Sequence, residues 1–187
     1  QLHDRPGREV IILPVSRGSR VREIRPPMKL TFRPTVVPSD LEAVRQIVQS
    51  TGFFTDDEID IAVELADAEL GAAGSSGYNF IFCEREGRVL GYTCFGPVIC
   101  TEGSYDLYWI AVHRDHQGSG VGGRLLARTE KSIRGMGGRR IYIETASREL
   151  YRPTQGFYLK AGYTKEAVLR DFYSEGDSKI IYVKHLG

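Results

Sequence analysis

The sequence predicts a mixed α/β sandwich of the α+β class, in which helices flank one central sheet. Two stretches with apolar residues at helical spacing come first, within residues 39–70. Three β-rich segments follow within residues 78–112, and their short connections predict an antiparallel meander. Helix-like and strand-like segments then alternate, and two strand-like segments close the chain. The expected order is β-α-α-β-β-β-α-β-α-β-β, a mostly antiparallel sheet of 6–7 strands with about four helices.

The beginning of the chain differs in composition from the rest. Residues 1–27 carry six arginines among prolines and glycines, and only VIILPV has the character of a strand. We interpret this part as an Arg-rich extension that ends at Pro26-Pro27, followed by a single domain over residues 28–187. A basic patch for nucleic acid is an alternative, but a solvated or partner-docked arm is the favoured interpretation.

The domain is expected to begin with a short strand, MKLTFRP, that ends at Pro34. Ser39 or Asp40 is suited to cap a first helix that runs to Gln49. Thr55 and Glu58 have the spacing of a capping box and predict the start of a second helix.

The flexible segment GAAGSSG then separates the helices from three strands, YNFIFCERE, RVLGYTCFGPV and SYDLYWIAV. A helix is predicted over about residues 119–134, followed by the strand RRIYIETA and a helix over about 154–160. The strands AVLRDFY and KIIYVKHL close the chain, with a hairpin turn at 175–177.

Composition and charge exclude several classes of protein. Hydrophobic residues make up 41% of the 187 residues and charged residues 26%, which is ordinary for a soluble globular protein. The net charge of +1 provides no global field toward nucleic acid or an anionic membrane. No apolar run approaches the roughly 18 residues that span a bilayer, and the charged start lacks the apolar core of a signal peptide. Three cysteines without metal-type spacing predict buried, reduced thiols in a cytoplasmic protein with no metal site.

A glycine-rich loop, HQGSGVGGRLL, separates the apolar strand LYWIAV from a predicted helix. The first amides of a helix lack internal partners, and the helix dipole places partial positive charge there. Glycine permits a positive φ and removes the Cβ that would keep a phosphate away from the backbone. Gly118, Gly120, Gly122 and Gly123 are therefore suited to hold a pyrophosphate through main-chain donors.

Three other interpretations of these glycines are possible from the sequence. A Walker loop ends in GK[ST], whereas Gly123 is followed by Arg124. A dinucleotide fingerprint fits Gly118, Gly120 and Gly123, with Glu144 about 20 residues further on, but it belongs to a parallel βαβ unit. Glycines that serve only a tight turn are the third alternative. Four glycines in six residues favour the phosphate site.

Two segments resemble the GNAT N-acetyltransferase superfamily. The loop Gln117–Gly122 fits the family motif Q/R-x-x-G-x-G/A, and WIAVHRDHQGSGVGGRLL is similar to its fourth strand, pyrophosphate loop and third helix. GFYLKAGY is similar to a later family segment that combines aromatic residues, a tyrosine and a glycine. The order of elements from Met28 onward also matches, so that the resemblance covers about 160 residues.

This resemblance implies acetyl-CoA as the donor, a primary amine as the acceptor, and direct attack in a ternary complex. In the family the fourth and fifth strands splay apart, usually beside a β-bulge, and the pantetheine arm lies in the gap. The implied cofactor contacts fall on the strand and on the loop amides: Ile110, Ala111, Val112, Gln117, Gly118, Ser119, Gly120, Val121, Gly122 and Gly123.

Transfer to an amine needs a base, because an alkylammonium with a pKa near 10.4 is almost fully charged at neutral pH. Glu144 in IYIETAS is the first candidate, since some family members that acetylate peptide N-termini use a glutamate at this position. An exposed strand carboxylate is the alternative interpretation. Asp106 is the rival base, and strict alternation places it opposite the Trp109 face. Tyr108 shares the face of Asp106 and is either a substrate contact or part of the core.

Tyr158 is the candidate acid, because it matches the family tyrosine that protonates the departing thiolate of coenzyme A. A phenol keeps its proton at pH 7, although a buried tyrosine that only fills the core is the alternative. Many family members also have an asparagine after the fifth strand, where this chain has Ser147. Candidate residues around the acceptor suit a cationic amine: Tyr78, Glu102, Tyr105, Asp106 and Tyr151.

The acceptor class stays open between small amines or amino acids, peptide N-termini and lysine side chains. A CoA-binding regulatory or interaction module without catalysis is the alternative function. Many family members dimerise through their closing strands, so the resemblance also admits a homodimer.

Overall fold

The computed structural model of the chain describes residues 11–12 and 29–187, and all structural statements below concern these residues. One sheet runs in the order β2-β3-β4-β5-β6-β8-β7, and β1 pairs with β5 as an eighth strand. The strands are β1 (Ile11–Ile12), β2 (Thr31–Arg33), β3 (Asn79–Arg85), β4 (Arg88–Pro97), β5 (Ser104–Val112), β6 (Arg140–Ala146), β7 (Thr164–Ser174) and β8 (Asp177–His185). The helices are α1 (Ser39–Thr51), α2 (Asp56–Gly71), α3 (Val121–Gly135) and α4 (Arg152–Lys160), with short 3₁₀ turns η1 (Arg114–His116) and η2 (Glu149–Tyr151).

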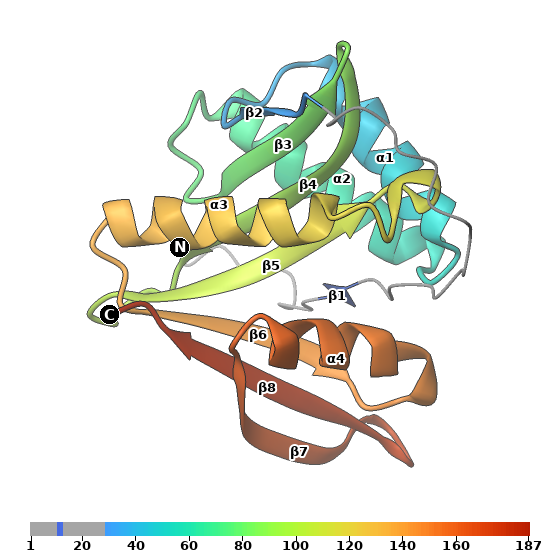
Figure 1. Cartoon of the computed structure of the whole chain (residues 1–187), viewed down its shortest axis with the longest axis vertical. Coiled ribbons are helices and arrows are strands. Elements are labelled where there is room, and N and C mark those ends of the chain that lie inside the picture. Colours follow the sequence, from blue (N-terminus) through green and yellow to red (C-terminus); the bar gives the residue numbers. More distant parts are fainter. Residues whose placement is uncertain (1–10, 13–28) are drawn as a thin grey trace, which may run out of the picture.

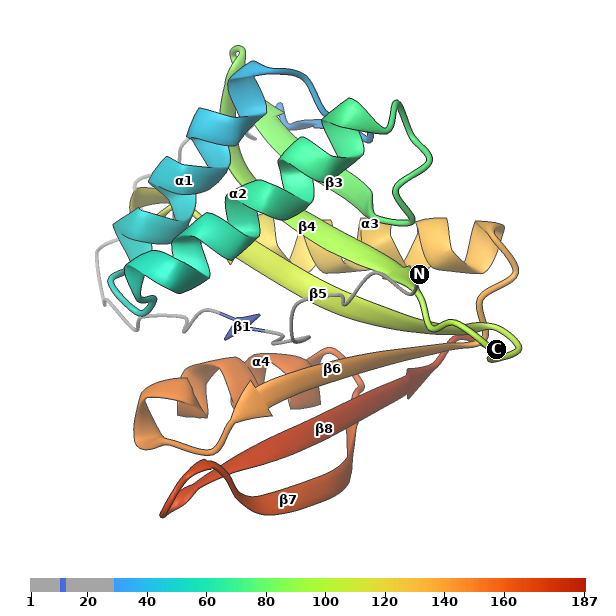
Figure 2. The ribbon, with the colours of Figure 1, turned by 180° about the vertical axis from the view of Figure 1, so that it is seen from behind.

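Helices cover both faces of the sheet, as Figures 1 and 2 show. Helices α1 and α2 lie over one face at β3 to β5, whereas α3 and α4 lie on the opposite face. Two buried clusters correspond to these faces. Val44, Ile47 and Trp109 belong to the α1–α2 core, and Leu125 and Tyr158 belong to the α3–α4 core. The predicted fold class and element order are therefore confirmed.

The capping box predicted for the second helix is confirmed, whereas the prediction that Ser39 or Asp40 caps the first helix is wrong, because both lie inside α1 and Pro38 holds the N-cap position without a side-chain cap. Thr55 accepts from the amide of Glu58, and the carboxylate of Glu58 accepts from the amide of Thr55 at 2.7 Å, which completes the capping box of α2. Asp40 lies in the first turn of α1, and its carboxylate accepts from the amide of Val37 at 2.8 Å. Thr55 and Glu58 thus satisfy amides at the start of α2, whereas Asp40 bonds an amide that precedes α1.

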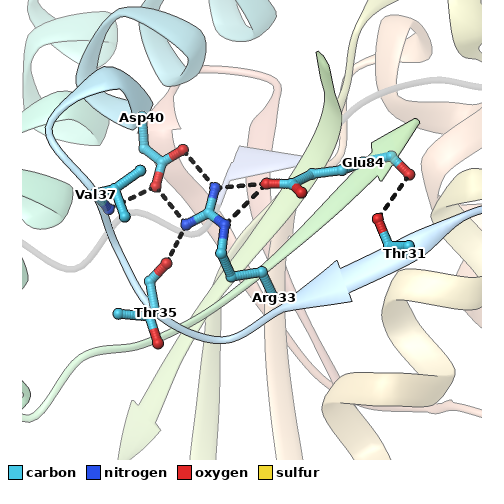
Figure 3. Close-up of polar contacts among 6 residues, drawn as sticks. All are labelled: Thr31, Arg33, Thr35, Val37, Asp40 and Glu84. Carbon is cyan, nitrogen blue, oxygen red and sulfur yellow. Dashed lines mark hydrogen bonds and ion pairs between the residues drawn. The ribbon is translucent and has the colours of Figure 1, made fainter. Parts of the chain in front are cut away.

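A partly buried ion-pair network fixes α1 against the sheet edge (Figure 3). Arg33 of β2 donates to both carboxylate oxygens of Asp40 at 2.8 Å and to Glu84 of β3. Its guanidinium also bonds the carbonyl of Thr35 and lies 4.8 Å from the ring centre of Phe82. The neighbouring carboxylates raise the pKa of Arg33, although burial acts in the opposite direction. Asp40 is only 1% exposed, so this cation compensates a charge that water does not reach.

Some details differ from the sequence predictions. Helix α3 begins at Val121, because Gly120 has φ +87° and ends the preceding loop. The 3₁₀ turns η1 and η2 were not predicted. All three cysteines are free thiols, as expected, but Cys100 is exposed rather than buried. In VIILPV the structure describes only β1, a two-residue strand; the other residues of the Arg-rich extension lie outside the described part. Within that part, no helix has the length and apolar character that a membrane crossing needs.

Candidate active site

Strands β5 and β6 are hydrogen-bonded at one end only. Their parallel pairing extends from Ser104 with Arg140 to Asp106 with Tyr142, and it stops there. Beyond that point the strands diverge, as the two ribbon views show (Figures 1 and 2). The main-chain groups of β5 on this side are therefore released from the β5–β6 ladder. The gap leads along β5 toward the loop that begins α3.

A β-bulge lies at the mouth of this gap. Cys94 pairs with Trp109 and Phe95 with Leu107, so that Tyr108 is an extra residue on β5. Leu107 packs in the α3–α4 core, whereas Tyr108 and Trp109 both pack in the α1–α2 core. The bulge shifts the alternation by one residue.

One prediction about Asp106 is therefore wrong. Strict alternation places Asp106 opposite the Trp109 face. In the structure the intervening Leu107 lies on the α3–α4 side, so Asp106 shares the α1–α2 side with Trp109. Asp106 and Tyr108 share a face, as predicted, because the alternation is regular from Asp106 to Tyr108 and shifts only at Trp109.

Strand β1 lies in the gap between β5 and β6 (Figures 1 and 2). It runs parallel to β5, with Ile11 opposite Trp109 and Ile12 opposite Ile110. This pairing shows that the edge of β5 in the gap accepts a second extended chain. Two extended chains cannot use this edge at the same residues.

The loop after β5 forms a cradle of main-chain amides. Gly118 and Gly120 have φ +73° and +87°, a region that side chains with a Cβ rarely adopt. The first backbone bond within α3 comes from the amide of Arg124 to the carbonyl of Gly120. The amides that precede Arg124 in this turn therefore have no partner within the helix. A Cβ on Gly123 would meet no atom within 4 Å, so this side of the turn is open.

Local contacts hold the cradle in place. The side-chain amide of Gln117 donates to the carbonyl of Val112 at 3.1 Å, which ties the loop to the end of β5. Ser119 donates to the carbonyl of His116 at 2.5 Å, and the side chain of Val121 is 1% exposed in the core. The cradle is thus anchored by side chains, while its amides stay on the outside. A cavity of about 360 Å³ continues from it between α3 and α4, lined by Gly123, Leu126, Phe157 and Lys160 among others.

The two histidines beside the loop, His113 and His116, are partly buried. His113 accepts from the amide of Asp115 at 3.3 Å and caps η1. Nε2 of His116 is buried and has no hydrogen-bond partner among the described residues. Burial lowers the pKa of His116 from its ordinary 6.5, and the nearby charge of Arg85 acts in the same direction.

The candidate base Glu144 lies just beyond the last paired residues of the gap. It follows Tyr142 by two positions, so the β5–β6 pairing has ended where its side chain emerges. Ile143 faces the α3–α4 core and Ala146 faces the α1–α2 core, which places Glu144 on the α1–α2 side. Its carboxylate is partly buried, and Oε2 lies 2.7 Å from Nζ of Lys179. Glu144 is therefore not the freely exposed strand carboxylate of the alternative interpretation.

The candidate acid Tyr158 stands on the opposite face. Its ring is fully buried, 5.6 Å from Tyr163 and 5.9 Å from Tyr182 between ring centres. Tyr182 pairs with Ile143 on the neighbouring strand, so Tyr158 lies at the level of Ile143 on the α3–α4 side. Burial raises the pKa of Tyr158 well above 10, and the neighbouring tyrosines add to this effect. The hydroxyl therefore keeps its proton at neutral pH.

Several buried polar atoms near the gap have no hydrogen-bond partner in the described part of the chain. These atoms are Tyr158 Oη, Thr145 Oγ1 and Glu144 Oε2, the last of which contacts Lys179 as an ion pair without hydrogen-bond geometry. A buried polar group without a partner is costly and is a candidate for contact with a ligand. Sequence reasoning missed Thr145, and it also missed Lys179. The contact of Lys179 with Glu144 depends on the register of β6 with β8, for which the sequence offered no signal.

The predicted acceptor residues are only partly brought together. Tyr78 and Tyr108 make an edge contact with ring centres 5.6 Å apart, and Tyr151 is buried in the same α1–α2 cluster. Tyr105 packs on the other face, and Glu102 is an exposed partner of Arg139.

Ser147 and its neighbours are engaged elsewhere. The Ser147 hydroxyl accepts from the amide of Ser178 at 2.8 Å, and Arg148 pairs with the buried carboxylate of Asp177 at 2.8 Å. Gln155 donates to the carbonyl of Ala146 at 3.1 Å, so it lies at the end of β6.

The diverging strands β5 and β6 lead to the glycine-rich N-terminus of α3, and this arrangement defines a class of fold. Comparison with known proteins identifies that class. The model of the GNAT acetyltransferase domain matches residues 76–165. A GNAT-family structure from Desulfovibrio desulfuricans is 46% identical with a TM-score of 0.83, and the match covers 84% of this chain and 99% of that one. The chain belongs to the GNAT acetyltransferase family.

More distant structures share the fold. The ribosomal-protein-S18-alanine N-acetyltransferase from Escherichia coli is 17% identical with a TM-score of 0.66, over 84% of this chain and 94% of that one. An aminoglycoside 6′-N-acetyltransferase complexed with coenzyme A is 16% identical with a TM-score of 0.69, over 86% and 98%. A search of curated protein sequences found no match.

Proposed function

We propose that this protein transfers the acetyl group of acetyl-CoA to a primary amine by direct attack in a ternary complex. The observation that carries the proposal is the divergence of β5 and β6 after Asp106 and Tyr142, which opens the gap toward the N-terminus of α3. The candidate base Glu144 and the candidate acid Tyr158 flank this gap from opposite faces of β6. Acetyl-CoA, when bound, would supply an acyl group activated as a thioester.

The residues of the cradle fit a diphosphate. Amides between Gly118 and Gly123 would donate to it, because they precede the first bonded turn of α3, whereas the amide of Gln117, also predicted as a contact, donates to the carbonyl of Arg114 at 3.3 Å. The positive φ of Gly118 and Gly120 turns the loop without side chains in the way. The edge of β5 at Ile110, Ala111 and Val112 would bind the amide-bearing arm as another strand does. Since β1 uses this edge at Ile110, we infer that it leaves the edge when the cofactor binds.

Glu144 is the base that we favour. Presenting a free alkylamine at pH 7 costs roughly 4–5 kcal/mol, because its pKa lies more than three units higher. A carboxylate that takes the proton, directly or through water, lowers this cost. Asp106 also faces the α1–α2 side, but it lies within the hydrogen-bonded part of β5 and β6. The acceptor would therefore approach from the α1–α2 side, at Glu144.

Tyr158 would protonate the sulfur of the leaving group. Its hydroxyl is buried, protonated and without a partner among residues 29–187, on the face opposite Glu144. A donor in such a place can serve a group that arrives with negative charge. The two residues thus act on opposite sides of the reacting carbonyl, one on the amine and the other on the thiolate.

The proposal extends to primary amines as a class: small amines or amino acids, peptide N-termini and lysine side chains. Two of the structural neighbours act on quite different amines, an aminoglycoside and an alanine of a ribosomal protein. At 16–17% identity they support the fold rather than either acceptor.

The free thiols of the described chain suit a reducing compartment such as the cytoplasm.

The edge strand β7 exposes Val168, Leu169 and Phe172, which supports a homodimer through the closing strands. Light scattering after gel filtration tests this assembly, and a monomer at high micromolar concentration would contradict it.

A calorimetric titration with acetyl-CoA, followed by a thiol-release assay over a panel of amines, amino acids and peptides, tests the function. We expect saturable binding and release of one thiol per acetylated amine. No binding at millimolar acetyl-CoA would overturn the proposal. Binding without turnover of any acceptor would instead favour a regulatory CoA-binding module.

A further inference from the structure

Lys179 is a buried charge whose position needs an explanation. It lies on β8 and is 7% exposed, although lysine is rarely buried without a partner. Taking an ammonium out of water costs several kcal/mol unless a nearby charge compensates for it. The groups that surround Lys179 therefore determine where its ammonium lies.

Strand register brings Lys179 to Glu144. Lys179 is directly opposite Ala146, and Glu144 is opposite Ile181, so both side chains emerge on the α1–α2 face of adjacent strands. Nζ of Lys179 lies 2.7 Å from Oε2 of Glu144. The pair is partly shielded from water, with side-chain exposures of 9% for Lys179 and 25% for Glu144.

Two aromatic rings also lie close to the ammonium. Nζ lies 3.9 Å from the ring centre of Phe172 and 5.7 Å from that of Tyr173, both on β7. A cation over an aromatic face is attracted by the negative charge of that face. Lys179 is therefore held by contacts with the rings of β7 and with the carboxylate of β6, which restrict its movement.

We infer that Lys179 positions Glu144 for proton abstraction, an inference that rests on the proposed function of Glu144 as the base. Fixing one oxygen of a carboxylate also fixes the direction of the other oxygen. The ammonium thus restricts the orientation of the base beside the gap. Lys179 acts through Glu144 and has no chemical step of its own.

A kinetic double-mutant cycle tests this role. Lys179→Met should lower kcat about 10- to 100-fold through misplacement of the base, with the KM for acetyl-CoA unchanged. In a Glu144→Gln background the same substitution should change kcat by less than about twofold, because the group that it positions is gone. The assay is thiol release at saturating acetyl-CoA with the best acceptor of the amine panel.

Two further variants keep the test decisive. Phe172→Leu removes the ring from an exposed position and should fold normally; it should cause a smaller loss of kcat that also vanishes with Glu144→Gln. Arg33→Met breaks another buried ion pair on the opposite edge strand of the sheet, and its effect on kcat should be independent of Glu144. Both variants separate positioning from a general loss of stability.

The outcomes distinguish the inference from the proposed function. If the wild-type protein acetylates an amine but the effects of Lys179→Met and Glu144→Gln on kcat multiply, Lys179 is only structural and the inference is overturned. An active Glu144→Gln variant with wild-type kcat also overturns it, because the base lies elsewhere. A wild-type protein that acetylates no amine overturns the proposed function, and the inference with it.

Discussion

Removal of the Tyr158 hydroxyl should make the protein more stable and less active. The ring is fully buried, and the hydroxyl has no partner in the described part of the chain. A buried polar group without a hydrogen bond costs about 1–3 kcal/mol. Tyr158→Phe keeps the ring and removes this cost, so we expect an increase of about 1 kcal/mol in the free energy of unfolding. For a chain of this size that corresponds to about 2–4 °C in Tm.

The activity of the same variant should change in the opposite direction. Loss of a general acid lowers rates by about 10²- to 10⁴-fold, and a hundredfold loss corresponds to about 2.7 kcal/mol in the activation free energy. The KM for acetyl-CoA should change little, since the phosphate cradle is untouched. Because burial raises the pKa of Tyr158 well above 10, its hydroxyl should not cause a fall in kcat below pH 10.

Tyr92→Phe is the matched control for this experiment. Tyr92 is also fully buried with an unpartnered hydroxyl, but it packs in the α1–α2 core against Phe80 and Phe82. It should gain a similar increase in Tm, while its kcat should stay within about twofold of wild type. Calorimetric melting and thiol release measure both effects. An unchanged kcat in Tyr158→Phe would refute the acid role, and a lower Tm would refute the account of its hydroxyl.

Three other substitutions test the remaining parts of the structure. Gly123→Val should raise the KM for acetyl-CoA at least about tenfold by crowding the phosphate, with little change in Tm. Gly135→Val is the control and should leave KM unchanged, because Gly135 has equally open surroundings at the other end of α3. Arg33→Met should cost about 3 kcal/mol of stability in urea unfolding, because it leaves the buried carboxylate of Asp40 without its cation; a loss below about 1 kcal/mol would contradict this. The lowered pKa of His116 favours its neutral form in the folded state, so its contribution to stability should be lost as pH falls below 6.5. His116→Gln should flatten this part of the stability profile between pH 7 and 5, and an identical profile would show that His116 does not titrate there.

Much of the fold follows from local patterns. The capping box at Thr55 and Glu58 placed the start of α2, and the glycine loop placed the start of α3 within two residues. The short 3₁₀ turns near His116 and Tyr151 were missed, because such turns need only a few residues and carry no periodicity. The position of Asp106 relative to Trp109 was wrong, since one extra residue on β5 shifts every side chain beyond it.

The sequence by itself determined the cradle of main-chain amides. A helix N-terminus and the φ angles of Gly118 and Gly120 are properties of adjacent residues, so their pattern is legible without the fold. Only the tertiary structure decided the surroundings of Glu144. Its contact with Lys179 links residues 35 positions apart. The contact depends on the register of β6 with β8, and hydrogen bonds between distant segments set that register. Chemistry carried by neighbouring main-chain groups can be predicted from a sequence, whereas chemistry that needs two strands in one register requires the folded sheet.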